Sequence, residues 1–368
     1  MFTQAENLRY ARHFSVEKIG RAGQETLKQS SILCIGAGGI GSPALLYLAA
    51  CGVGKLAFID DDSVELSNLQ RQVLFSERDE GRAKVECARD KLFALNTACE
   101  LVPINDRLSL ANIDVLLDGY DLVIDGSDNY ETRYLVADAC AQKKIPLISA
   151  SIYQFSGQLI ALSHQSSPCY RCLYPNPPPE GVIPNCAQAG VLGTVPGVLG
   201  TLAATEAIKH LLNLPEKLNN SFVQLDLLNM QMKRHPIITR KDCPTCQLHK
   251  PLKDLSEAPK KANAIPVLTC EALKSWFDSG KAFTLIDVRE AWERDICQID
   301  GDKAVPLADI REMDVSEFKS PLVIYCRSGG RSAQAVYWLK NRGLKDVYNL
   351  QGGIIAWIKD FEPHKSSY

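Results

Sequence analysis

The sequence predicts an α/β protein with two domains, a larger one built on a parallel sheet and a smaller α/β domain after it. Three observations predict this fold class. The chain has 368 residues, whereas a typical domain has about 150. Residues 1–250 alternate between short apolar runs and segments with helical spacing, a pattern typical of a parallel sheet with helices on both faces. A shorter pattern of the same kind occupies residues 265–368.

The first domain is expected to start with a regular alternation of strands and helices. Short apolar runs predict strands at 31–35, 55–60, 100–104, 121–125 and 146–150. Apolar residues with helical spacing predict helices at 40–51 and 81–95. After residue 151 we expect strands at 158–163 and 222–227 and a long apolar helix at 191–214.

A proline-rich segment interrupts this second half of the first domain. Residues 174–184 contain five prolines, and proline lacks the amide donor that regular structure needs. We therefore expect a long loop there, and long loops inside compact domains are usually functional.

A polar segment with two prolines, residues 251–264, predicts a linker between the domains. The first domain then covers residues 1–250 and the second covers 265–368. In the second domain we expect strands at 283–288 and 322–326, and helices at 269–279, 332–342 and 353–358.

Composition excludes several classes of function. Lys and Arg total 41 against 43 for Asp and Glu, so the net charge is −2 and gives no support to nucleic-acid or anionic-membrane binding. No run approaches the ~20 apolar residues of a membrane span, and the polar residues 1–12 do not resemble a secretory signal. Thirteen cysteines in such a chain indicate thiols of a reducing compartment, so we expect a cytoplasmic protein.

The first candidate site is a glycine-rich loop between a strand and a helix. Gly36, Gly38 and Gly41 form G-x-G-x-x-G directly after the first strand, where backbone amides and a helix N-terminus bind phosphate. Asp60 ends the next strand and can bind ribose hydroxyls. By itself this pattern is compatible with NAD binding.

The residues that follow favour a nucleoside triphosphate. Asn68 and Arg71 come after the ribose carboxylate, Lys84 begins a helix, and Asp128 follows an apolar strand. Arg71 and Lys84 can neutralise a triphosphate, and Asp128 can hold Mg²⁺. Hydride transfer does not need this set. The alternative is a set of surface charges at strand ends.

These motifs, in this order, resemble the MoeB/ThiF group, relatives of ubiquitin-activating enzymes. The matching segments are G-A-G-G-I-G, I-D-D-D, S-N-L-Q-R-Q, G-R-A-K and D-G-S-D-N, and the resemblance covers residues 1–250. It implies a Rossmann-like domain that adenylates the C-terminal glycine of a ubiquitin-like protein with ATP and Mg²⁺. The nucleotide residues that it implies are Gly36, Gly38, Gly39, Gly41, Asp60, Asp62, Ser67, Asn68, Arg71, Lys84, Asp128 and Asn129.

The opening segment Arg9-Tyr10-Ala11-Arg12 also matches this group. The resemblance implies that Arg12 reaches the nucleotide of a partner protomer, and therefore that the protein is a homodimer.

Two C-x-x-C pairs predict a structural zinc site. Cys169 with Cys172 and Cys243 with Cys246 supply four thiolates, which complete a tetrahedral site and leave no position for water. A redox pair is the alternative for either motif. The pairs also resemble the zinc site of the MoeB/ThiF group. Because four cysteines complete the site, the nearby His164 and His249 are interpreted as surface residues.

Cys186 lies at the end of the proline-rich loop. In the MoeB/ThiF group this loop crosses the nucleotide site, and the resemblance implies that its cysteine attacks the acyl-adenylate or a sulfur intermediate. The alternative is a buried small side chain. The seven other cysteines outside the candidate sites are interpreted as packing residues: Cys34, Cys51, Cys87, Cys99, Cys140, Cys270 and Cys297.

A second nucleophile is expected at Cys326. It follows an apolar strand and opens the loop Cys326-Arg327-Ser328-Gly329-Gly330-Arg331 before a helix. Loop amides, the helix N-terminus, Arg327 and Arg331 place the thiol in positive potential, and a core position is not expected for it. The C-x4-R spacing is one residue shorter than the C-x5-R loop of phosphatases, which suits a persulfide sulfur.

Together with D-V-R-E at 287–290 and L-Q-G-G-I-I-A-W at 350–357, this loop resembles a rhodanese domain over residues 265–365. The chain departs from the G-H-I-x-G pattern of rhodaneses at 297–301, which leaves the local geometry there open.

The two resemblances together imply an adenylyltransferase and sulfurtransferase. One domain would adenylate a ubiquitin-like sulfur carrier ending in Gly-Gly, and the other would carry sulfur on Cys326, loaded by a persulfide donor such as a cysteine desulfurase. Such fused proteins serve molybdenum cofactor biosynthesis or tRNA thiolation, and thiamine synthesis stays open. The alternatives are a NAD-dependent oxidoreductase fused to a sulfurtransferase and a non-catalytic carrier-binding scaffold.

Overall fold

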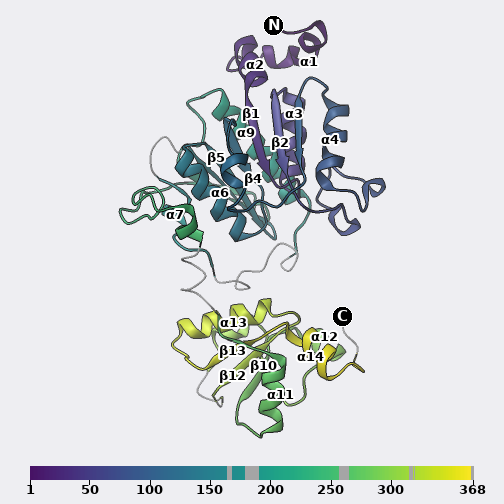
Figure 1. Ribbon diagram of the computed structural model, residues 1–368, viewed down its shortest axis with the longest axis vertical. Coiled ribbons are helices and arrows are strands. Elements are labelled where there is room, and N and C mark those ends of the chain that lie inside the picture. The colour runs from purple at the N-terminus through teal and green to yellow at the C-terminus, as the bar shows by residue number, and fades with distance from the viewer. Residues whose placement is uncertain (164–167, 179–189, 257–264, 315–317, 319, 366–368) are drawn as a thin grey trace. The chain divides into compact units, whose positions relative to one another are not determined.

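The computed structural model describes residues 1–163, 168–178, 190–256, 265–314, 318 and 320–365. These residues form two compact units, one with an eight-stranded sheet and one with a five-stranded sheet (Figure 1). In the described part of the chain, no helix has the length and apolar character that crossing a bilayer requires.

The sheet of the first unit has the strand order β3-β2-β1-β4-β5-β6-β7-β8. The first five strands of the chain run parallel, as predicted: β1 (Ser31–Ile35), β2 (Lys55–Ile59), β3 (Glu100–Ile104), β4 (Leu122–Asp125) and β5 (Leu147–Tyr153). The sheet then continues antiparallel through β6 (Ser156–Leu162), β7 (Ser221–Asp226) and β8 (Gln231–Pro236).

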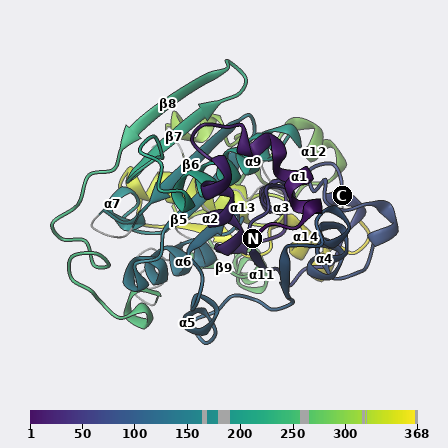
Figure 2. The same ribbon diagram turned by 90° about the horizontal axis from the view of Figure 1, so that it is seen from above.

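Helices cover both faces of this sheet. α3 (Gly41–Cys51), α4 (Lys84–Leu95) and α9 (Thr194–Leu211) contribute to one apolar core, and α6 (Tyr130–Lys143) contributes to the other. Figure 2 shows α9 and α6 on opposite sides of β5. Alternate residues of each strand enter alternate cores, because successive side chains point to opposite faces.

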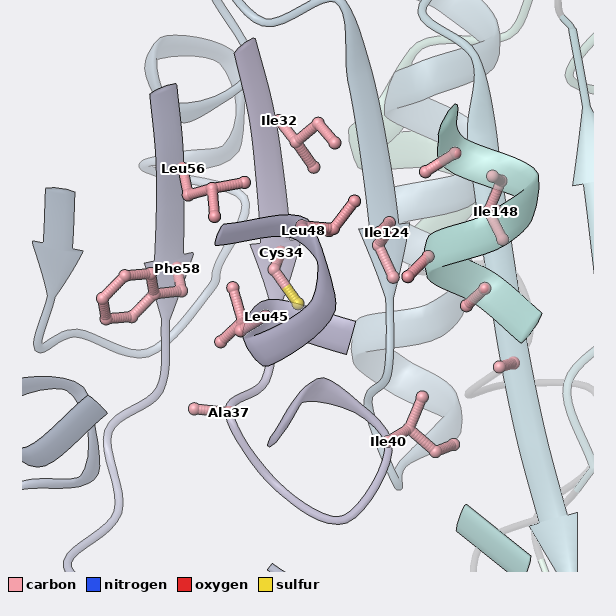
Figure 3. Close-up of a cluster of buried hydrophobic side chains, with 14 of the residues drawn as sticks. Ile32, Cys34, Ala37, Ile40, Leu45, Leu48, Leu56, Phe58, Ile124 and Ile148 are labelled. Atoms are coloured by element: carbon pink, nitrogen blue, oxygen red, sulfur yellow. The ribbon is translucent and has the colours of Figure 1, made fainter. Parts of the chain in front are cut away.

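The core between the sheet, α3 and α9 places the glycine loop. Ile32 and Cys34 of β1 face Leu45 and Leu48 of α3, with strand residues from β2 and β4 on either side (Figure 3). Each such side chain contributes about 1.5–3 kcal/mol when it is fully buried. α3 therefore packs against β1, and this packing fixes the N-terminus of α3 at the carboxyl end of that strand.

Several elements of the first unit were not predicted from the sequence. They are α1 (Gln4–Phe14), α2 (Gly20–Gln29), α6, the short α5 (Ile113–Leu116) and α7 (Tyr170–Leu173), and β8. The residues of α6 from Arg133 to Cys140 are all buried, so the helix has no polar face and no amphipathic period. β8 is an edge strand of mostly exposed residues, so it lacks the alternation that reveals a strand.

Several predicted boundaries differ from the observed ones by a few residues, and one of them bears on the site. The helix expected from residue 81 begins at Lys84, because Gly81 has φ +80° and its amide donates to the carbonyl of Val64. This places Lys84 in the first turn of α4.

The second unit has a parallel sheet with the order β11-β10-β12-β13-β9. Its strands are β9 (Val267–Leu268), β10 (Thr284–Asp287), β11 (Lys303–Ala304), β12 (Leu322–Tyr325) and β13 (Val347–Leu350). Its helices are α11 (Cys270–Asp278), α12 (Ala291–Ile296), α13 (Gly330–Asn341) and α14 (Gly353–Phe361). β12 lies at the centre and is buried throughout, so its carboxyl end opens into the loop of Cys326.

Candidate functional site

The glycine loop joins β1 to α3 by close backbone contacts. Gly36 has φ +86°, and a Cβ on Gly41 would lie 1.9 Å from the carbonyl oxygen of Gly36. The amide of Gly36 donates to the carbonyl of Ile59 at 2.8 Å, and that of Gly126 donates to Ile35 at 3.0 Å. The loop therefore lies between the ends of β2 and β4, at the carboxyl ends of the parallel strands, where nucleotides bind in such sheets.

Asp60 and Lys84 lie together beside this loop. Asp60 accepts a hydrogen bond from the amide of Ala37 at 2.8 Å. Lys84 is only 4% exposed, and its Nζ lies 2.6 Å from Asp62 Oδ2 and 3.8 Å from Asp60 Oδ1. Burial raises the pKa of Asp60, against the opposing effect of the Lys84 ammonium. The structure thus places a buried cation and two carboxylates next to the phosphate-binding loop.

Arg71 borders the same loop from the segment after β2. Ser67 and Asn68 belong to a short 3₁₀ helix, η1 (Leu66–Asn68), and Arg71 Nη1 donates to the carbonyl of Ser67 at 3.1 Å. Arg71 Cγ lies 3.5 Å from the position of a Cβ on Gly39. The aliphatic part of the Arg71 side chain therefore packs against the glycine loop.

The turn after β4 brings Asp128 to the same carboxyl end of the strands as the glycine loop. Asp128 and Asn129 are exposed, and the backbone of Gly126 and Ser127 packs against Gly36. Asn129 is also the N-cap of α6, because its Oδ1 accepts from the amide of Thr132 at 2.8 Å. That oxygen is engaged in the cap, which leaves the amide group of Asn129 for a ligand.

Asp125, three residues earlier, was not predicted as a site residue and has a structural position. It is fully buried and accepts hydrogen bonds from the hydroxyls of Ser127 at 2.6 Å and Ser149 at 2.7 Å. These bonds hold the turn that presents Asp128.

Arg12 belongs to α1, the helix that lies near the amino ends of the parallel strands, away from the glycine loop. It is an exposed residue of α1, and Tyr10 of the same helix packs against Gly52, where α3 ends. In Figure 1, α1 and α2 stand near the start of β1, whereas the glycine loop follows its end. The predicted role of Arg12 in a partner's site stays a prediction.

The four cysteines of the two C-x-x-C pairs meet in space. Their sulfur atoms all lie within 4.8 Å of one another, with Cys169 and Cys243 3.4 Å apart and Cys172 and Cys246 3.5 Å apart. Zn–S bonds of about 2.3 Å in a tetrahedron require sulfurs about 3.8 Å apart. The hydrogen bond between the sulfurs of Cys169 and Cys243 lowers the pKa of Cys243 to about 5. The donor set fits zinc.

Asp138, which the sequence did not reveal as a site residue, forms hydrogen bonds with a residue of each C-x-x-C pair. Asp138 of α6 accepts from Arg171 Nη2 at 2.8 Å and from Thr245 Oγ1 at 2.7 Å. Arg171 lies inside the first C-x-x-C and Thr245 inside the second, and all three side chains are buried. No motif marks Asp138, because only the packing of α6 brings it to the cysteines.

Replacing one ligand, as in Cys172→Ser, is expected to reduce zinc from one equivalent per chain to a small fraction. The melting temperature should fall by at least about 5 °C, since a closed metal site contributes directly to folding. Elemental analysis and calorimetry measure both quantities. Cys51→Ser, at a cysteine outside the cluster, is the control and should retain zinc. Wild-type protein purified without chelator and free of zinc would contradict the assignment.

Cys326 is held by the loop that follows β12. Its Sγ accepts from the amide of Gly329 at 3.2 Å and from Ser332 Oγ at 3.3 Å. Behind it, Ile354 donates its amide to the carbonyl of Cys326 at 2.9 Å, and a Cβ on Gly353 would lie 2.4 Å from that carbonyl. The loop thus surrounds the sulfur with hydrogen-bond donors and packs against the first residues of α14.

The expectation that Cys326 would not be a core residue is wrong. It is 1% exposed and packs with Ile324, Val336 and Leu339, because the loop folds back over the strand end. A buried sulfur with two donors still suits an anionic persulfide.

The two arginines of this loop are placed differently. Arg327 is exposed. Arg331 forms a two-pronged ion pair with Glu293 of α12, with N–O distances of 2.6 and 2.5 Å, and Glu293 is 3% exposed. The ion pair with Glu293 lowers the potential that Arg331 adds at Cys326, and the predicted role of Arg331 there stays a prediction.

Glu293→Gln is expected to lower the stability of the second unit. One charged pair is weakened, and the loss should be about 1–2 kcal/mol, reduced by solvent because the Arg331 side chain is 30% exposed. Calorimetry measures the change as a lower melting temperature. Glu312→Gln, at an exposed position, is the control. An unchanged melting temperature in the Glu293 variant would show that the pair adds nothing.

The departure from the rhodanese pattern at 297–301 leaves an ordered turn. Ile299 is buried, its amide donates to Tyr325 Oη at 3.2 Å, and Gly301 has φ +82°. Arg289 Nη2 donates to the carbonyl of Cys297 at 2.7 Å. Cys297 is thus a buried packing residue, as predicted.

The other described residues interpreted as structural or surface residues also have the expected environment. Cys51 is half-buried and His249 is exposed. Cys186 and His164 lie outside the described residues. The remaining packing cysteines are all buried: Cys34, Cys87, Cys99, Cys140 and Cys270.

Comparisons with known proteins match both units. The model of the ThiF family matches residues 10–247, and that of the Rhodanese-like domain matches residues 269–360. The "Probable adenylyltransferase/sulfurtransferase MoeZ" of Mycobacterium tuberculosis is 38% identical over 385 residues, covering 100% of this chain and 96% of the relative. The "Adenylyltransferase and sulfurtransferase MOCS3" of Sus scrofa is 37% identical, covering 96% of this chain and 86% of the relative.

Solved structures resemble the larger part of the chain. Escherichia coli MccB with ATP aligns with a TM-score of 0.57 and 23% identity, covering 67% of this chain and 76% of that one. The structure of PaaA aligns with a TM-score of 0.55 and 22% identity, over 65% and 76% of the two chains. At these identities the likeness shows the fold alone.

Proposed function

The chain belongs to the ThiF family and carries a rhodanese-like domain after the ThiF part, and from this premise we propose that it adenylates a ubiquitin-like sulfur carrier and then transfers sulfur to it. The observation that carries the proposal is likeness along both domains to relatives whose names state both activities. The carrier's C-terminal glycine is the acceptor in both steps.

Adenylation joins the carrier carboxylate to the α-phosphate of ATP and releases pyrophosphate. The glycine loop and the N-terminus of α3 supply amide donors for the phosphates. Lys84 and Arg71 neutralise charge on the triphosphate, and Asp60 binds the ribose. Asp128 would hold Mg²⁺, which stabilises charge on the departing pyrophosphate. Lys84 is suited to this role because it is buried beside two carboxylates, so its ammonium is already in place.

Sulfur transfer starts from a persulfide on Cys326. Its terminal sulfur attacks the acyl-adenylate carbonyl and displaces AMP, which leaves an acyl disulfide between carrier and Cys326. A second thiol then attacks Cys326 Sγ, releases the carrier thiocarboxylate and leaves a disulfide, which a cellular thiol reductant returns to thiols. Cys186 is the candidate for the second thiol.

The remaining partners follow from the same proposal. A persulfide donor such as a cysteine desulfurase loads Cys326, and a homodimer lets Arg12 serve the partner's nucleotide site. The carrier would be of the type used in molybdenum cofactor biosynthesis; carriers of thiamine synthesis or tRNA thiolation need the same chemistry.

One experiment separates this function from an oxidoreductase or a scaffold. The protein is incubated with ATP, Mg²⁺, labelled pyrophosphate and a carrier ending in Gly-Gly. Carrier-dependent exchange of label into ATP supports the proposal, since only a reversible adenylation produces it. Absence of exchange with several such carriers, together with NAD binding, would favour the oxidoreductase.

A further inference from the structure

Gln72, which lies next to Arg71, has no assigned role in the site. It is 3% exposed, yet among the described residues its Oε1 finds no hydrogen-bond partner. Buried amides are almost always hydrogen-bonded, and leaving one unpaired costs about 1–3 kcal/mol. The unpaired atom is an acceptor, and the oxygen and nitrogen of a glutamine amide exchange places when the amide flips, so its N–H donors can also occupy this position.

The position of Gln72 relates it to the phosphate-binding loop. Its Nε2 lies 3.7 Å from the position that a Cβ on Gly38 would take. Arg71 Cγ lies 3.5 Å from the position that a Cβ on Gly39 would take. Two successive residues thus flank two successive glycines. Gly38 is the second glycine of G-x-G-x-x-G, the point at which backbone and pyrophosphate approach most closely.

The backbone around Gln72 is fixed in advance of any ligand. Its amide donates to the carbonyl of Asn68 at 3.0 Å, and its carbonyl accepts from Phe75 at 3.0 Å. Leu74 and Phe75 are buried in the core that also contains α3. The side chain therefore starts from a rigid turn and costs little entropy to orient.

We propose that Gln72 is a nucleotide-binding residue whose side-chain amide donates a hydrogen bond to the phosphate chain of ATP at Gly38. This rests on the proposed function, since it takes ATP as the substrate. A glutamine amide offers two N–H donors, and its oxygen makes no bond within the described part of the chain that would fix the amide's orientation. Without a charge it can approach phosphate and still lie buried beside Arg71.

The test compares stability and binding in Gln72→Met, which keeps the length of the side chain but removes both polar atoms. Without nucleotide, the melting temperature should be equal to or above that of the wild type, because an unpaired buried group is replaced by an apolar one. Calorimetric titration with ATP and Mg²⁺ should show binding at least ~10-fold weaker, the loss expected for one hydrogen bond to a charged group. Gln72→Glu, which loses the donors and adds a negative charge, should weaken binding further.

Gln70→Met is the matched control, because Gln70 lies in the same loop and its side chain is exposed. It should keep the wild-type affinity and melting temperature. ATP affinity within twofold of wild type in Gln72→Met would overturn the inference. So would a clear fall in its nucleotide-free melting temperature, which would mean that the amide has a structural partner. If wild-type protein itself fails to bind ATP, the proposed function fails instead.

Discussion

Cys326→Ala is expected to abolish thiosulfate:cyanide sulfurtransferase activity and to leave carrier adenylation nearly unchanged. The Sγ that Gly329 and Ser332 hold is the atom of the loop that forms the persulfide, so an alanine has nothing to replace it. The nucleotide residues from Gly36 to Asp128 belong to the other compact unit, and the pyrophosphate exchange that they support should persist. Both activities are measured on the same full-length preparation.

Mass spectrometry gives the decisive control for this prediction. After treatment with thiosulfate, the peptide that contains Cys326 should gain one sulfur, about 32 Da, and a reductant should remove it. Cys270→Ala, at a buried cysteine of α11, should keep the modification. If the added sulfur maps to Cys186 or Cys297, the role given to Cys326 is wrong.

Asp128→Ala is expected to lower pyrophosphate exchange by at least ~1,000-fold without unfolding the protein. A group that positions Mg²⁺ against the phosphates contributes several kcal/mol to the transition state, and about 1.4 kcal/mol corresponds to each tenfold. Asp128 is exposed, whereas the turn around it is held by Asp125 and its serines. The melting temperature should therefore stay close to that of the wild type.

Asp128→Asn tests the charge separately from the shape and should be nearly as inactive. Asp114→Ala, at an exposed acid on α5, is the control for the loss of one surface carboxylate. Near-normal exchange in either Asp128 variant would remove Asp128 from the catalytic set.

The sequence alone determined the features that have a local signature. β1, β2 and β4 are short runs whose residues are almost all buried, so apolar character alone reveals them. The two C-x-x-C pairs and the glycine loop have fixed spacings, because a tight turn or a close backbone contact constrains neighbouring residues. For the same reason the resemblance to two families identified both domains from their motifs alone.

Tertiary structure decided the features that depend on contacts between distant residues. Asp138 binds Arg171 and Thr245, which are 33 and 107 residues away in the chain, and so connects the two C-x-x-C pairs. Glu293 forms an ion pair with Arg331, 38 residues away. No spacing rule links such positions, since they meet only when α6 or α12 packs against its sheet. The burial of Cys326 and the side-chain oxygen of Gln72, which has no partner among the described residues, have the same origin. In both cases, elements from elsewhere in the chain fold onto the side chain and set its surroundings.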